Sequence, residues 1–276
     1  MRVEVLCVGV LVATVAIGPR PAAADTHAIS RRGWPGDATR WVAGLRCEPE
    51  RDPVAAPASP SPAPVVVVGF TGGRERRDSR RSGVVRAGQA VAAATDRDHV
   101  TVRLYNNAEW ADAVRDVSAA AARTGRARPL VVAYGHSLGA GSIGRFARAL
   151  AGAGVAVDLA VYIDAFGWRN PRVPANVRQA VNFYQRTGLL RGLPLRGKRE
   201  LIAESPATTT LLGNYRLTPE TPRFGWNWNL IQPLLYRQHH RLAHDVRIRE
   251  LLVAVAETGR HGEVCGSTAA GEPEAR

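Results

Sequence analysis

The chain has 276 residues, of which 45% are hydrophobic and 22% charged, so it is long and apolar enough to bury a full globular core. Its formal net charge of +13 comes almost wholly from arginine, and Lys198 is the single lysine. The arginines are spread along the whole chain without a nucleic-acid-binding motif or interleaved aromatic residues, which argues against a nucleic-acid partner. Contact with an anionic surface is compatible with this charge.

The first 24 residues have the pattern of a cleaved secretory signal peptide. Arg2 precedes an apolar run over 5–17, Gly18-Pro19 would end a helix there, and three alanines end at Ala24, before the expected cut. The run is shorter than the ~18 to 20 apolar residues of a membrane anchor. We therefore expect a secreted or periplasmic protein whose N-terminal segment, 25–63, ends in a solvated Pro/Ala/Ser linker.

The cysteines fit an exported protein. Cys7 would leave with the signal peptide, which leaves Cys47 before the expected core and Cys265 after it. We expect a disulfide between Cys47 and Cys265 that staples the two ends together, because export exposes them to an oxidising environment. Two unrelated free thiols are the alternative.

From Pro64 onward, stretches typical of buried strands alternate with stretches typical of helices. The run from Val65 to Val68 is continuously β-branched, as expected of a central strand covered on both faces of a parallel sheet. Strands are expected at 64–70, 99–104, 130–134, 155–163, 181–185 and 209–214, and helices at 83–94, from Asn107 or Asp112 to 123, at 138–150 and at 245–257. This alternation predicts an α/β fold, a three-layer sandwich with a mostly parallel sheet of about six strands, in a domain at 64–258 followed by a C-terminal tail at 259–276.

Three further expectations concern the helix ends. The charged stretch 74–81 is expected to be a solvated surface loop, and Ser82 is expected to cap the helix that follows it. Asp245 is expected to cap the closing helix. The apolar side chains of that helix that should face inward are Val246, Ile248, Leu251, Leu252 and Val255.

The pentapeptide Gly135-His136-Ser137-Leu138-Gly139 stands between an expected strand and an expected helix. In this context G-x-S-x-G is typical of a nucleophile elbow, a sharp turn that holds a serine in a strained backbone conformation. The residues two before and two after the serine must be small, because strand and helix approach closely there. Ser137 is therefore the candidate nucleophile, with a chance match in a Gly-rich chain as the alternative. His136 is expected to point away from the reacting centre.

A serine nucleophile needs a base and an acid that orients the base. Asp164 directly follows the strand after the elbow, so its carboxylate should emerge at the same edge of the sheet as Ser137. Asp158 begins that strand and should lie at the opposite end. Asp164 is therefore the candidate acid, and a turn or helix-capping role is the alternative.

The base should follow the last strand. His239, His240 and His244 lie in that segment, and His244 with Asp245 forms the entry to the closing helix. The residues alone leave both His239 and His240 open as the base. Adjacent histidines also occur in metal sites, but no carboxylate or cysteine spacing completes one here, so we expect neither a metal nor a cofactor.

An oxyanion hole should use two backbone amides. Leu138 follows the nucleophile and supplies the first. The second should come from the Gly-rich loop after the first strand, with Phe70 as the preferred donor and Thr71 as the alternative.

These stretches resemble the α/β-hydrolase superfamily over 64–257. VVVVGFTGG at 65–73 is similar to its oxyanion strand and loop, VVAYGHSLGAG at 131–141 to its elbow, and VYIDAF at 161–166 to the acid-bearing strand of its lipase and thioesterase branch. That branch carries the acid one strand earlier than most members, and its pattern favours His239 over His240 because His239 stands three residues before Leu242. Val68 departs from the histidine that is common there, and the usual first strands are missing, which implies a minimal domain.

The resemblance implies a serine hydrolase that cleaves carboxylic esters or thioesters through an acyl-enzyme. Its substrate would be a small-molecule or lipid ester, and the apolar segment 218–238 would either line an acyl pocket or simply pack on the sheet. The alternative is a catalytically idle α/β-hydrolase fold that acts as an extracellular binding protein.

Overall fold

The computed structural model describes residues 64–73, 75–124, 128–166, 170–185, 200–217 and 239–261. The predicted signal peptide, the linker, both cysteines of the expected disulfide and the apolar segment 218–238 lie outside these ranges. Within the described part of the chain, no helix combines the length and the apolar character needed to cross a membrane.

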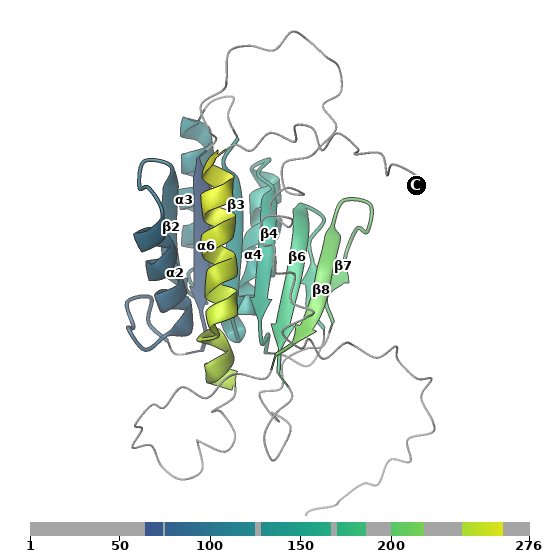
Figure 1. Ribbon diagram of the computed structural model, residues 1–276. Helices are drawn as coiled ribbons and strands as arrows, with labels where there is room; N and C mark the ends of the chain where they lie inside the picture. The colour runs from purple at the N-terminus through teal and green to yellow at the C-terminus, as the bar shows by residue number, and fades with distance from the viewer. Residues whose placement is uncertain are drawn as a thin grey trace, which may run out of the picture.

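A single six-stranded sheet forms the centre of the molecule (Figure 1). Its spatial order is β2-β1-β3-β4-β6-β8, and every neighbouring pair is parallel. The strands are β1 (Val65–Thr71), β2 (Val100–Asn106), β3 (Leu130–His136), β4 (Val157–Ile163), β6 (Val177–Tyr184) and β8 (Thr210–Arg216). The predicted α/β fold with a mostly parallel sheet of six strands is confirmed.

Helices cover both faces of this sheet. They are α2 (Gly83–Ala94), α3 (Trp110–Arg123), α4 (Leu138–Gly152) and α6 (Val246–His261). Apolar side chains of α2 and α6 join one buried cluster on the sheet, and those of α3 and α4 join another on the opposite side. The two clusters make the three layers, and the strands between them are buried on both faces, as their continuous apolar runs predicted.

Several details differ from the sequence-based expectations. A second, two-stranded sheet pairs β5 (Arg172–Val173) with β7 (Ile202–Ala203), and strands this short carry no periodic signal. Helix α3 starts at Trp110, between the two expected positions, where the Glu109 carboxylate accepts a 2.8 Å hydrogen bond from the Asn106 amide.

The ends of α2 and α6 also show differences. Ser82 precedes α2 but makes no capping bond, because its hydroxyl instead donates to the Glu75 carboxylate at 2.6 Å. Asp245 does cap α6, since its Oδ1 accepts the Arg247 amide at 3.0 Å. Val246, the first residue of α6, is 40% exposed rather than inward, which corrects the expectation for this residue. The other four apolar residues expected to face inward from α6 are buried.

The parallel topology sets where chemistry can occur. The carboxyl ends of β1, β3 and β4 lie side by side and lead into Gly72, Ser137 and Asp164. Asp158 lies near the opposite end of β4, where it accepts the Val131 amide at 2.8 Å and pairs with Arg128. Asp158 therefore has a structural role, as its position in the strand predicted.

Two glycines of α4 provide a test of this packing. A Cβ at Gly139 would lie 2.2 Å from the Phe70 carbonyl oxygen, whereas a Cβ at Gly141 would meet nothing within 4 Å. We expect Gly139→Ala to lower the free energy of unfolding by about 2 to 3 kcal/mol, because α4 must move away from β1. Gly141→Ala should raise it by about 0.5 to 1 kcal/mol through helix propensity. Urea unfolding followed by circular dichroism measures both, and equal effects would contradict the close approach of α4 to β1.

Candidate active site

Ser137 occupies a sharp turn between β3 and α4. Its backbone has φ 57° and ψ −119°, a conformation that costs a non-glycine residue about 1 to 3 kcal/mol. Two hydrogen bonds hold it there: the Ser137 amide donates to the Ile163 carbonyl at 3.0 Å, and the Ser137 carbonyl accepts the Phe166 amide at 3.2 Å. The neighbouring strand β4 and the loop after it therefore impose the strain on the turn.

The glycines of the pentapeptide are required by close packing across this turn. A Cβ at Gly135 would lie 2.6 Å from the backbone of Gly139. This is the spacing argument by which the sequence predicted a nucleophile elbow. The turn has the predicted backbone geometry, and the Ser137 side chain remains 7% exposed.

Asp164 is placed at the same edge, immediately after β4. It is fully buried, and its two carboxylate oxygens accept bonds from the Gln185 amide at 3.3 Å and the Gln185 side-chain nitrogen at 3.1 Å. His239 Nδ1 lies 2.8 Å from Asp164 Oδ2. Because an ionised carboxylate only accepts, Nδ1 is the protonated nitrogen, and Nε2 is left as the basic nitrogen of the ring.

The structure brings His239, and not His240, to Asp164. His239 is 3% exposed and lies in a helical turn that is described over 239–243 and is anchored by the fully buried Leu242. The turn packs tightly on α2, since a Cβ at Gly83 would lie 2.2 Å from the Ala243 carbonyl oxygen. The His240 side chain is 46% exposed and faces Glu75, with 3.6 Å between Nδ1 and Oε1.

His136 does not point away from the site, which corrects the expectation from the sequence. Its ring lies against that of His239, with centroids 4.3 Å apart, and its Nε2 is 3.0 Å from the His239 carbonyl oxygen. A carbonyl only accepts, so Nε2 carries the proton, and among the described residues the buried Nδ1 has no hydrogen-bond partner. His136 therefore packs against His239, the candidate base. The pentapeptide pattern treats this position as arbitrary, so no sequence signal marked it.

The backbone amides expected in an oxyanion hole belong to different elements of the fold. Leu138 is the first residue of α4, where the helix leaves amide groups without an intrahelical partner. Phe70 lies inside β1, level with Tyr105 and Gly135, and its side chain is fully buried. Gly72 faces the nucleophile directly, because a Cβ there would lie 3.2 Å from the Ser137 Cβ. The Phe70 or Thr71 amide as second donor stays a prediction, and Gly72 joins the candidates.

Burial decides the charge of the two inner histidines. Desolvation lowers the pKa of His239, the charge of His240 lowers it further, and Glu75 opposes both. Desolvation likewise lowers the pKa of His136 well below its ordinary value. Both rings are therefore neutral at pH 7, and a neutral imidazole is the form that can accept a proton.

Within the described ranges, no group of three histidine, cysteine or acidic side chains is arranged to hold a metal ion. The titratable groups that converge at this edge are His136, Asp164, His239, His240 and Glu75.

Comparison with known proteins gives only distant structural likeness. No protein-family model and no curated protein matches the chain. A cutinase-like protein from Cryptococcus sp. is similar in structure, with 16% sequence identity, 75% of this chain and 100% of that chain covered, and a TM-score of 0.38. The esterase domain of a Rhodothermus marinus protein is similar with 12% identity, 75% and 90% coverage and a TM-score of 0.33. Likeness at this level carries no argument about activity, so the chemistry of the site rests on its own geometry.

The buried neutral histidines predict acid sensitivity. A histidine whose folded pKa is depressed binds its proton only in the unfolded state, so stability is lost as pH falls below the unfolded value near 6.5. His136→Gln keeps a donor for the His239 carbonyl and removes one such group. We expect the loss of unfolding free energy between pH 7 and pH 5 to be smaller in this variant by about 2 kcal/mol. Urea titrations at the two pH values measure it, and parallel losses would refute the burial of a neutral His136.

Proposed function

We propose that the protein is a serine hydrolase that cleaves carboxylic ester or thioester bonds. One observation carries this proposal: a serine on a strained turn and a buried histidine hydrogen-bonded to a buried aspartate converge at one edge of the sheet. The roles follow from the chemistry of each group, with Ser137 as nucleophile, His239 as base and Asp164 as the acid that orients the base.

The proposed reaction proceeds in two halves. His239 Nε2 takes the proton of Ser137 as Oγ attacks the substrate carbonyl, and Asp164 stabilises the imidazolium that forms. The Leu138 amide and a second amide from the loop after β1 stabilise the negative charge on the carbonyl oxygen. The imidazolium then protonates the leaving group, and water hydrolyses the acyl-enzyme with His239 acting as base again.

A catalytically idle binding protein is the alternative, and the stability that the fold loses at this site argues against it. The turn at Ser137 is strained, and Asp164 is an acid with no exposed surface. Each feature lowers stability, and neither adds to a binding surface, since both groups are more than nine-tenths buried. Their convergence is expected when the serine must react.

Apolar side chains beside the nucleophile support apolar substrates. Leu138 directly follows Ser137 and is 41% exposed, and Phe166, whose amide binds the Ser137 carbonyl, is 38% exposed. Exposed side chains of this size next to a reacting group favour esters with an apolar acyl or alcohol part, either small molecules or lipids. The positive net charge supports contact with an anionic surface that presents such lipids.

Export is part of the same proposal, since the pattern at 1–24 is that of a cleaved signal peptide. We expect the mature protein, purified from culture medium or periplasm, to begin at Asp25 when its N-terminus is sequenced. A protein that stays in the cell with Met1 attached would contradict export.

The nucleophile is tested with a fluorophosphonate probe, which labels activated serines. We expect wild type to be labelled at Ser137 and Ser137→Ala to be unlabelled and to lose about 10⁴-fold or more in kcat/KM on a short-chain nitrophenyl ester. Ser118→Ala serves as the control, because its buried hydroxyl has no hydrogen-bond partner among the residues that the structure describes. Absence of labelling in wild type, or equal labelling of Ser137→Ala, would sink the proposal.

The base is tested by paired substitutions. His239→Ala should abolish turnover of the nitrophenyl ester, because it removes the ring that Asp164 orients. His240→Ala should retain measurable turnover, since its ring contacts Glu75 instead. Loss of turnover in His240→Ala alone would assign the base to His240.

A further inference from the structure

We propose that Glu75 is a positioning residue of this site, which ties the loop after β1 to the helical turn that carries the base. This role rests on the proposed function and extends it. The residue belongs to the charged stretch 74–81, which the sequence predicts to be a solvated loop. Glu75 departs from that prediction, because its side chain is only 23% exposed and turns inward.

The Glu75 carboxylate joins two other elements. Oε2 accepts a 2.6 Å hydrogen bond from the hydroxyl of Ser82, at the start of α2. Oε1 lies 3.6 Å from His240 Nδ1, on the helical turn 239–243. That turn also packs on Gly83, the first residue of α2. The Glu75 carboxylate therefore links the loop after β1 both to the start of α2 and to the helical turn that carries His239.

The Glu75 backbone fixes the loop that faces the nucleophile. Its carbonyl accepts the Thr71 hydroxyl at 2.8 Å and the Asn106 side-chain amide at 2.7 Å, and its amide donates to the Gly72 carbonyl at 2.9 Å. Gly72 is the residue beside Ser137. One residue therefore anchors both the backbone that would face the reacting carbonyl and the turn that holds the base.

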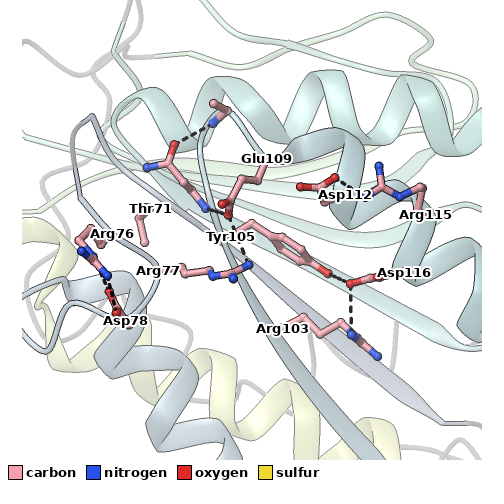
Figure 2. Close-up of polar contacts among 12 residues, drawn as sticks. Thr71, Arg76, Arg77, Asp78, Arg103, Tyr105, Glu109, Asp112, Arg115 and Asp116 are labelled. Carbon is pink, nitrogen blue, oxygen red and sulfur yellow. Dashed lines mark hydrogen bonds and ion pairs between the residues drawn. The ribbon is translucent and has the colours of Figure 1, made fainter.

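Two arginines of this loop, Arg76 and Arg77, have acidic partners other than Glu75. Arg76 pairs with Asp78, and Arg77 faces Glu109 at the start of α3 (Figure 2). Asp78 is thus a carboxylate on the same loop, three residues from Glu75, whose partner is an exposed arginine. It provides a matched control for the loss of one negative charge.

The groups that face the base give Glu75 an electrostatic effect as well. The ring of His239 meets Asp164 at the end of β4, His136 from β3 and His240 from its own turn. Glu75 faces His240 from the loop after β1, and its charge acts on His239 from there. Burial raises the pKa of Glu75, but the contact with His240 and the hydrogen bond from the Ser82 hydroxyl outweigh it, and the pKa is lowered to about 2. The carboxylate is therefore ionised wherever the enzyme works, and its charge raises the pKa of His239 while that of His240 lowers it.

The test compares pH profiles of kcat/KM for nitrophenyl ester hydrolysis. Glu75→Gln keeps the size of the side chain and can still bind Ser82. We expect the plateau value of kcat/KM to fall about tenfold, because the loop after β1 is no longer held to the turn that carries His239. The pH at which kcat/KM falls on the acid side should move lower by about half a unit, because a negative charge near His239 is lost. His240→Gln breaks the same contact from the other side and should move the acid limb to higher pH, because it removes a cationic neighbour of His239.

Two further variants separate positioning from folding. Glu75→Asp restores the negative charge on a side chain that is one methylene shorter. The acid limb of its pH profile should return toward that of wild type, and the plateau value of kcat/KM should recover in part. Asp78→Asn should leave plateau and acid limb as in wild type. A wild-type profile for Glu75→Gln, or shifts of the same sign in Glu75→Gln and His240→Gln, would overturn the proposal. Fluorophosphonate labelling of wild type is scored beside these assays, so that a failure of the proposed hydrolase function is seen separately.

Discussion

The hydrogen bond between His239 and Asp164 joins two segments that lie 75 residues apart in the chain, and the candidate site depends on it. Both side chains are buried, so the loss of this bond would leave a buried polar atom with one partner fewer. The bond fixes which nitrogen of the ring carries the proton, and Gln185 holds the carboxylate from the other side. Packing of Leu242 in the core and of Ala243 on α2 then brings the ring to the sheet edge.

Backbone strain in the described part of the chain coincides with the same residues. There, the non-glycine residues with positive φ are Ser137 and Asp164. Each immediately follows a central strand of the parallel sheet, and each is held by backbone hydrogen bonds to a neighbouring element. Strain of this kind persists only where the surrounding structure over-determines it. The strained backbone of the described residues therefore falls at the proposed nucleophile and the proposed acid.

The sequence predicted the sheet well because its central strands are long apolar runs, and such runs have few other structures open to them. It predicted Ser137 and Asp164 because the position of each depends on a local feature, the end of a strand. The choice between His239 and His240 was different. Adjacent residues on a helical turn point about 100° apart, so the inward one is set by where the turn packs, which is a tertiary fact. Only the resemblance to a family favoured His239.

Glu75, His136 and Gly72 escaped the sequence analysis for physical reasons. Glu75 stands in a run of charged residues, and such runs are usually solvated. Its burial follows from contacts with Ser82, which no sequence pattern links to it, and with His240, which is distant in the sequence. His136 occupies a variable position of a short motif. Gly72 would act through its backbone, which has no side-chain signature. Sequence patterns thus indicated Ser137 and Asp164 as candidates, whereas the side chains packed around His239 required the folded structure.

The central claim is that Ser137 becomes acylated because His239, held by Asp164, removes its proton. Rapid-quench mass spectrometry of the protein mixed with nitrophenyl acetate tests this most directly. We expect a transient mass gain of one acetyl group on the peptide containing Ser137, formed in wild type and absent in His239→Ala. Hydrolysis of the ester without acetylation of Ser137, or acetylation that proceeds equally in His239→Ala, would contradict the account.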